Sequence, residues 1–251
     1  MKKIIALVLL AAMALTLVAC GAKTTETTET KPTLTMGTNA HFAPYEFRDE
    51  NDKIVGIDAE IAQAVADKIG MTLEIKDMDF DSLLTAVQGG SIDIVLAGLT
   101  VTEERKQAVN FSDSYATGIQ AIIVPENSTI ATADDLKGNT IGVQSGTTGD
   151  IYCTDDFGAE NVKQYKDGPS AVAALLAGQV NCVVIDNEPA KNLVAANAGL
   201  KLLETAYTEE QYAAAINKDN KDLLEKFNKA LSELKADGTI NKIVEKYIPA
   251  K

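Results

Sequence analysis

The sequence predicts an α/β protein made of two lobes of similar build. The chain has 251 residues, enough for two lobes with packed cores. From residue 33 onward, short apolar runs alternate with amphipathic segments, a pattern typical of mainly parallel sheets covered by helices. Residues 83–98 (LLTAVQGGSIDIVLAG) and 171–186 (AVAALLAGQVNCVVID) share one pattern of apolar helix, glycine, short turn and strand. This likeness predicts two matching lobes, and chance agreement between two generic α/β units is the alternative.

Residues 1–32 are expected to form a targeting segment followed by a tether. Two lysines are followed by an apolar run over 4–19, shorter than the roughly 20 residues that span a bilayer, which predicts a signal peptide over 1–19. The run ends in LVAC-G, which resembles the lipobox of bacterial lipoproteins and predicts a lipid on Cys20. A plain signal peptide with an incidental cysteine is the alternative. Residues 20–32 are rich in Thr and Glu, so we expect a disordered tether and an extracytoplasmic protein anchored to the membrane.

The first lobe is expected to alternate strands and helices. Its longest helix has Asp58 as a candidate cap, Ile61, Val65 and Ile69 as one apolar stripe, and Gly70 as its end. The predicted elements are a strand over 33–37, a helix over 56–70, a strand over 72–78, a helix over 80–90 and a strand over 93–98.

The second lobe repeats the alternation, and two helices close the chain. The predicted elements are a strand over 140–144, a helix start over 147–153, a strand over 161–165, a helix over 169–179, a strand over 181–186, and a helical stretch over 219–247 broken near Gly238.

Composition excludes several classes of function. The formal net charge is −13, which argues against nucleic acid, whose binding rests on basic patches. His41 is the single histidine, and no Cys and His cluster has metal-ligand spacing, so we expect no metal and no other cofactor. A Ser-His-Asp triad could use only His41, and the G-x-S-x-G pattern is missing.

Polar residues at matching strand ends predict a ligand site between the lobes. Gly98 ends one strand and is followed by Thr100 and Arg105, while Asp186 ends the matching strand. Ligands of open α/β sheets bind outside the carboxyl ends of strands. An arginine meets a carboxylate with a planar fork, and an aspartate suits an ammonium, so the pair describes an α-amino acid. Arg105 alone could equally be a solvated helix charge.

Five stretches, in this order and spacing, resemble the polar-amino-acid solute-binding proteins of bacterial ABC importers. They are GTNAHFAPYEF (37–47), DKIVGIDAEIAQAVADKIG (52–70), MDFDSLLTAVQGGSIDIVLAGLTVTEERKQAVNFSDSY (78–115), IGVQSGTTGD (141–150) and NCVVIDNEP (181–189). The resemblance implies a type II periplasmic-binding-protein fold, with two lobes joined by two crossing strands that close on the ligand. It also implies a membrane permease as partner, no enzymatic activity and a monomer.

The expected boundaries and residue roles follow from this resemblance. Lobe 1 is expected over 33–119 and 212–251 and lobe 2 over 120–211, with crossings near 119–123 and 213–216. The resemblance assigns Gly98, Thr100, Arg105 and Thr148 to the α-carboxylate, the Gly98 carbonyl, Thr100 and Asp186 to the ammonium, and Phe42 and Phe80 to a sandwich around the ligand side chain. Phe80 could instead be an ordinary core aromatic.

Two amide side chains bear on selectivity. Asn39 stands where many relatives that take cationic amino acids have an aspartate, and Gln144 lies where relatives also contact the side chain. We therefore expect an uncharged polar ligand over a cationic one. His41 could line the pocket or face solvent. Asp77, Asp79 and Asp81 weaken this expectation, since one of them could reach the pocket.

An enzyme of the same fold is the alternative function. Cyclohexadienyl or arogenate dehydratases use a buried acid in such a cleft, and Glu188 is the candidate here. In the second lobe, Cys153 and Cys182 are expected to lie close together, either as a disulfide or as two buried thiols.

Overall fold

The computed structural model describes residues 31–203 and 208–249. The predicted signal peptide over 1–19, the lipid on Cys20 and the tether up to residue 30 lie outside the described residues. Among the residues that are described, no helix is long and apolar enough to cross a membrane.

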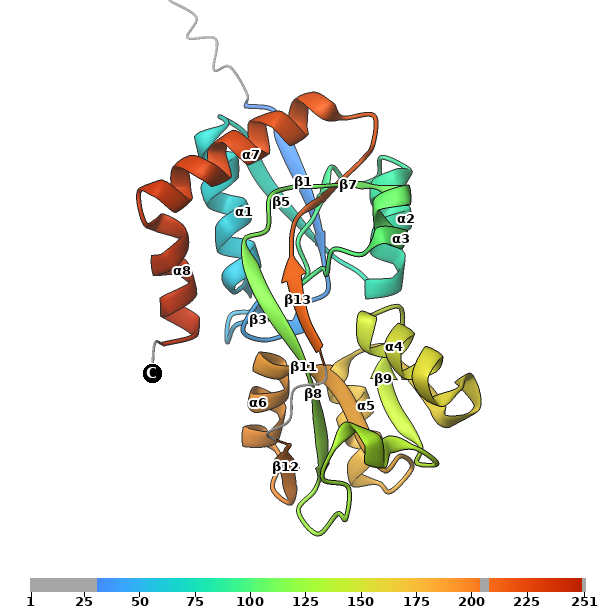
Figure 1. Cartoon of the computed structure of the whole chain (residues 1–251). Coiled ribbons are helices and arrows are strands. Elements are labelled where there is room, and N and C mark those ends of the chain that lie inside the picture. The colour runs from blue at the N-terminus through green and yellow to red at the C-terminus, as the bar shows by residue number, and fades with distance from the viewer. Residues whose placement is uncertain (1–30, 204–207, 250–251) are drawn as a thin grey trace, which may run out of the picture. The chain divides into compact units, whose positions relative to one another are not determined.

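The first lobe is built on a five-stranded sheet in the order β5-β1-β6-β14-β7. Figure 1 labels β5, β1 and β7 of this sheet. Strand β1 pairs in parallel with β5 and β6, whereas β14 pairs antiparallel with β6 and β7. The alternation predicted from the sequence is confirmed, although the strand expected over 93–98 is paired only over its first part. The elements are β1 (Thr33–Thr38), α1 (Ile57–Lys68), β5 (Thr72–Asp77), η1 (Phe80–Ser82), α2 (Leu83–Gln88), β6 (Ile94–Val95), α3 (Glu103–Ala108), β7 (Asn110–Phe111) and β14 (Ala215–Ile216).

Helix α1 has the predicted stripe but not the predicted cap. Ile61 and Val65 are fully buried, and the helix ends before Gly70, whose φ of 76° is left-handed. The cap position is Gly56, and Asp58 lies inside the first turn with a buried carboxylate. Asp58 bonds instead to groups far away in the sequence, so its assignment as the cap was wrong.

A small antiparallel sheet follows β1 and was not predicted. It consists of β2 (His41–Phe42), β3 (Glu46–Arg48) and β4 (Ile54–Val55). Its short strands fall below the length at which alternation gives a clear signal. The sheet carries Phe42 and Glu46 as cross-strand neighbours.

The second lobe is built on a sheet in the order β10-β9-β11-β8-β12, with β13 paired to β8. Strand β9 lies in parallel with β10 and β11, and β8 is antiparallel to β11 and β12. The elements are β8 (Ala116–Pro125), η2 (Ala133–Leu136), β9 (Ile141–Gln144), α4 (Thr148–Phe157), η3 (Ala159–Asn161), β10 (Val162–Tyr165), α5 (Gly168–Leu176), β11 (Cys182–Asp186), α6 (Asn187–Ala196), β12 (Leu200–Leu202) and β13 (Thr208–Tyr212).

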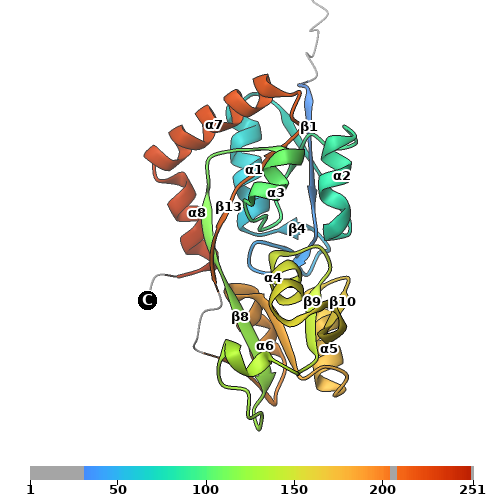
Figure 2. The same ribbon diagram turned by 45° about the vertical axis from the view of Figure 1, so that its right-hand side comes forward.

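Strands β8 and β13 run side by side from one lobe to the other (Figure 1, Figure 2). They pair antiparallel from Thr208 opposite Gln120 to Tyr212 opposite Ala116. The crossing expected near 119–123 lies within β8. The crossing expected near 213–216 is wrong, because Ala215–Ile216 is β14 of the first sheet and the second crossing strand is β13. The boundaries 119/120 and 211/212 stay a prediction.

Two helices close the chain as predicted. Helix α7 (Lys221–Ala236) and helix α8 (Thr239–Tyr247) are separated at Gly238, whose φ of 79° only glycine adopts readily. Their apolar faces belong to the same core cluster as α1.

The two lobes repeat one local design in detail. In the first, Ser91 N donates to Ala86 O (3.0 Å) around Gly90, and in the second Gln179 N donates to Ala174 O (2.9 Å) around Gly178. Both glycines have left-handed φ, 72° and 69°, as the αL helix ending requires.

The strand starts match as well. Asp93 Oδ2 accepts from Thr35 N (2.7 Å), and Asn181 Oδ1 accepts from Thr140 N (2.8 Å). The same spacing then leads to Gly98 in one lobe and Asp186 in the other. The likeness between the two lobes that the sequence predicted therefore extends to individual hydrogen bonds.

Cys153 and Cys182 are both free and fully buried in one apolar cluster under the second sheet. They are close neighbours, as predicted, and of the two alternatives the structure shows buried thiols. Burial raises the pKa of the Cys182 thiol to about 12, which makes it unreactive.

Candidate ligand-binding site

One pocket between the lobes gathers all nine residues singled out from the sequence. Three further residues line it, namely Glu46, Ala97 and Thr147. Ala97 and Thr147 are chain neighbours of predicted residues, but nothing local to Glu46 signals its position. The nine are Asn39, Phe42, Phe80, Gly98, Thr100 and Arg105 from the first lobe, and Gln144, Thr148 and Asp186 from the second.

Arg105 is the one buried residue of helix α3. Its side chain is 6% exposed, so the alternative of a solvated helix charge is wrong. The guanidinium donates from Nη1 to Thr100 O (2.7 Å) and from Nη2 to Gly146 O (3.0 Å). These two bonds use part of its five N–H donors and leave others for a ligand. Burial lowers the pKa of Arg105, and the negative charge of Glu210 opposes that shift.

Asp186 ends β11 and carries the negative charge of the pocket in the second lobe. Tyr212 Oη donates a short hydrogen bond to Asp186 Oδ1. Burial, together with the charge of Glu210, raises the pKa of Asp186 to about 7. A buried carboxylate of this kind gains from a cationic partner such as an ammonium group.

Glu210 of β13 joins the two lobes behind the pocket. Its Oε2 accepts hydrogen bonds from Thr100 Oγ1 and from Gln120 Nε2, both at 3.0 Å. Gln120 also donates to Thr148 Oγ1 (3.4 Å). Glu210 is 5% exposed and was not predicted to belong to the site, because it lies on β13, a crossing strand that was expected near 213–216.

The start of α4 offers backbone donors to an anion. Thr147 caps the helix by accepting from Asp150 N (3.3 Å), and Thr148 is its first residue. N–H groups of a first helical turn lack partners within the helix and favour negative charge. Arg105 is tied to the preceding loop at Gly146, so this helix start and the guanidinium lie on the same side of the pocket.

Two aromatic rings line the pocket. Phe42 lies against Gly98, where a Cβ would come within 2.5 Å of the ring, so only glycine fits at that position. The ring of Phe80 lies 5.7 Å from the Arg105 guanidinium carbon. Phe80 also packs against the apolar cluster of α2, so it lines the pocket and anchors its helix at once.

The amide side chains of Asn39 and Gln144 meet across the pocket. Gln144 Nε2 donates to Asn39 Oδ1 (3.0 Å), and Asn39 Nδ2 donates to Met78 O (2.9 Å). His41 is exposed and lies outside this pocket, in a neighbouring groove.

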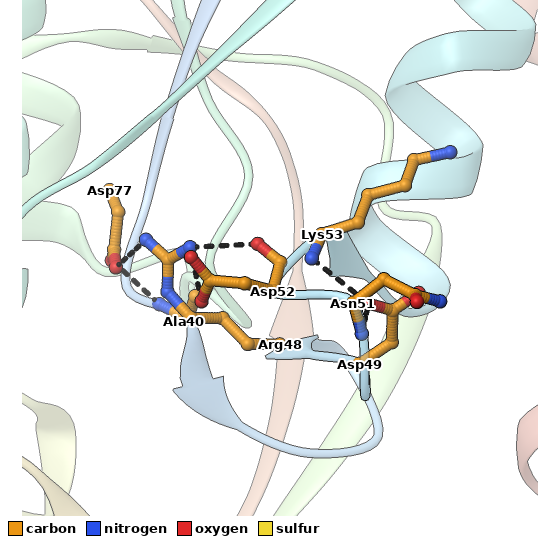
Figure 3. Close-up of polar contacts among 7 residues, drawn as sticks. All are labelled: Ala40, Arg48, Asp49, Asn51, Asp52, Lys53 and Asp77. Atoms are coloured by element: carbon orange, nitrogen blue, oxygen red, sulfur yellow. Dashed lines mark hydrogen bonds and ion pairs between the residues drawn. The ribbon is translucent and has the colours of Figure 1, made fainter.

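None of the three aspartates at and after the end of β5 lines the pocket. Asp77 accepts from Ala40 N (3.0 Å) and from Arg48 Nη2 (2.9 Å), so it holds the chain that leads to Phe42 (Figure 3). Arg48 is also bonded to Asp52 in the turn beyond β3 (Figure 3). Asp79 is exposed, and Asp81 accepts from Ser145 Oγ (3.1 Å). The expectation that one of these acids could reach the pocket is therefore wrong.

The two lobes touch each other around the pocket. Hydrogen bonds join them from Gln144 to Asn39, from Arg105 to Gly146, from Ser145 to Asp81 and from Asn192 to Ala43. The structure therefore describes a closed arrangement of the lobes.

A two-lobed α/β fold with an arginine and an aspartate buried in one inter-lobe pocket defines a protein that captures small solutes. The model of the bacterial extracellular solute-binding proteins, family 3, matches residues 34–250, and the chain belongs to that family. It is 35% identical to the arginine-binding extracellular protein ArtP of Bacillus subtilis, over 98% of each chain. It is 32% identical to the L-cystine-binding protein TcyJ of Escherichia coli K12, over 87% of this chain and 83% of that protein.

Solved structures agree with this assignment. An ancestral arginine-binding protein bound to arginine is 45% identical, with a TM-score of 0.82 over 87% of this chain and 99% of that one. The structure of an ancestral arginine-binding protein bound to glutamine has a TM-score of 0.84 at 43% identity, over 88% and 99% of the two chains. The fold predicted from the sequence is confirmed. This protein is an extracytoplasmic amino acid-binding protein that serves an ABC importer.

These relatives are binding proteins, which favours binding over the dehydratase alternative. Glu188, the candidate acid of that alternative, does not line the pocket described above. Its carboxylate accepts hydrogen bonds from Lys191 Nζ and Asn187 Nδ2.

Proposed function

We propose that the pocket holds a free polar L-amino acid by its backbone groups. Arg105 and the start of α4 receive the α-carboxylate, and Asp186 with Thr100 and the Gly98 carbonyl receives the ammonium. The observation that carries this pose is the burial of one arginine and one aspartate, from different lobes, in a single pocket. Each charge is costly to bury alone, and a zwitterion neutralises both.

The side chain of the ligand extends between Phe42 and Phe80 toward Asn39 and Gln144. That end of the pocket offers amide donors and acceptors and aromatic faces, and the nearby acids Asp77 and Asp81 do not line it and are bonded elsewhere. An uncharged polar side chain such as that of L-glutamine suits these groups. L-Arginine is the second candidate, because it suits aromatic faces and is the ligand named for ArtP.

We further propose that the mature protein is a monomer held at the membrane by a lipid on Cys20. The LVAC-G stretch and the Thr- and Glu-rich residues after it support this anchor. A lipid at one end and a folded body at the other keep the protein near its permease.

A ligand screen tests the pocket assignment. The protein, refolded to remove carried-over ligand, is heated with each of the twenty amino acids, since a ligand raises the melting temperature by mass action. Calorimetry on the best amino acids then gives affinities. We expect L-glutamine or L-arginine to give the largest shift. No shift with any amino acid would refute the proposal, and turnover of prephenate or arogenate would support the enzymatic alternative.

A further inference from the structure

Asp58 connects the ligand loop to the start of the hinge strand. Its Oδ2 accepts hydrogen bonds from Gly98 N (2.7 Å) and from Tyr115 Oη (2.6 Å). Gly98 belongs to the pocket, and Tyr115 is the residue directly before β8. A carboxylate with two donors on one oxygen is well placed to keep its negative charge.

Glu46 lies beside Asp58 without any donor of its own. It is fully buried, it is the cross-strand neighbour of Phe42, and its side chain lies within hydrogen-bonding reach of Asp58. Within the described part of the chain, Glu46 Oε1, Glu46 Oε2 and Asp58 Oδ1 are buried and face no donor. Two carboxylates are acceptors only, so contact between them requires one shared proton.

The surroundings of Glu46 favour keeping that proton. The charged groups that act on it are Asp58 of α1, Asp186 of β11 and Asp77 of β5, all of them acidic. The two phenols nearby, Tyr45 and Tyr115, are neutral. Burial raises the pKa of Glu46 well above its ordinary value and that of Asp58 to about 6.

We propose that Glu46 is protonated and donates a hydrogen bond to Asp58 Oδ1, and that this acid pair positions Gly98 for the ligand and Tyr115 for the hinge. Asp58 then has donors on both oxygens, and every buried oxygen of its carboxylate is satisfied. Glu46 acts through Asp58 and is a positioning residue. The link to the ligand rests on the proposed role of Gly98, whereas the shared proton does not.

The proposal predicts a definite sign for the pH dependence of folding. Glu46 in the unfolded chain loses its proton near its ordinary pKa, while the folded protein retains it. The stability contributed by Glu46 is therefore complete at low pH and is lost as the pH rises through the range between the two pKa values. Across that range the ratio of unfolded to folded protein grows by about tenfold per pH unit from this group alone.

Urea denaturation without ligand, at several values between pH 5 and 9, tests the shared proton. In Glu46→Gln the amide N–H₂ replaces the acid proton as donor to Asp58, and no proton can leave. We expect this variant to lose the slope above pH 7, where Asp58 and Asp186 no longer contribute, and to be more stable than wild type there. Glu50→Gln, an exposed acid of the same hairpin, is the matched control and should follow wild type. Parallel profiles for wild type and Glu46→Gln would overturn the proposal.

Infrared spectroscopy keeps the proposal testable if that variant does not fold. Protein labelled with ¹³C at glutamate side-chain carboxyl groups should show, at pH 7.5, the shifted C=O band of a protonated acid buried in the core. Absence of this band, or its appearance only with labelled aspartate, would overturn the assignment of the proton to Glu46.

Binding measurements test the positioning role separately. The probes are L-glutamine and L-arginine, with wild type as reference. Glu50→Gln, the exposed control outside the pocket, should bind within about threefold of wild type. Asp58→Ala leaves Gly98 N and Tyr115 Oη without their acceptor and should weaken binding by roughly 5-fold to 150-fold. Unchanged affinity in Asp58→Ala would refute the positioning role. If neither probe bound to wild type, the proposed ligands would be refuted. The urea and infrared experiments would still test the shared proton, because they do not depend on a ligand.

Discussion

Replacement of Arg105 by alanine is the most direct test of how the pocket holds its ligand. The side chain is 6% exposed and is fixed by two hydrogen bonds to Thr100 O and Gly146 O. Its removal leaves a bound α-carboxylate without a counter-charge, close to the acids Asp186 and Glu210. Breaking one side of a buried charge pair costs about 3–5 kcal/mol. At about 1.4 kcal/mol per tenfold, affinity should fall by roughly 100-fold to 4,000-fold.

Isothermal titration calorimetry with the amino acid chosen by the screen measures this loss. Lys106→Ala is the matched control, because Lys106 is on the same helix, is exposed and, among the described residues, pairs with the exposed Glu103. Loss of such a surface pair should change affinity by less than about fivefold. The affinity of Arg105→Lys should lie between those of Arg105→Ala and Lys106→Ala, since an ammonium keeps the charge but cannot form the planar fork.

One result would refute the assignment of the carboxylate to Arg105. If Arg105→Ala bound its amino acid within threefold of wild type and remained folded, the arginine would serve only to tie Thr100 to Gly146. Circular dichroism and a melting curve on the same sample separate this result from loss of the fold.

Three further predictions follow from the structure. Asp186→Asn should weaken binding about as strongly as Arg105→Ala. The affinity of the wild type should fall as the pH drops through about 7, because Asp186 must be ionised to meet the ammonium and its pKa lies near that value. Calorimetry between pH 5 and 8 checks both predictions, and an affinity that does not change with pH would contradict the role of Asp186. Solution scattering should give a smaller radius of gyration with ligand than without it, and an unchanged radius in a sample with confirmed binding would argue against closure about β8 and β13. Thiol titration of the unfolded, non-reduced mature domain should find two free thiols, and a Cys153→Ala/Cys182→Ala variant should bind as wild type does; loss of binding in a folded double variant would show that the thiols matter to the pocket.

Local patterns in the sequence were sufficient to predict most of the fold. Helix ends at Gly90 and Gly178 depend on residues within one turn, so they repeat visibly in both lobes. The alternation of strands and helices likewise depends on near neighbours and was predicted in the right order. Strands of two or three residues were missed, because such short runs carry too little periodicity to be recognised.

The candidate site, like the fold, was predicted only in part from the sequence. The sequence by itself determined that Asp186 ends one strand and that Arg105 follows the end of the matching strand, and strand ends meet at one edge of a sheet. Only the tertiary structure decided which acids surround them. Glu210 reaches Thr100 across 110 positions in the sequence, and Asp58 reaches Gly98 across 40. The charge state of a buried carboxyl is set by the donors and acids that packing brings to it from distant segments, and no local pattern records those neighbours.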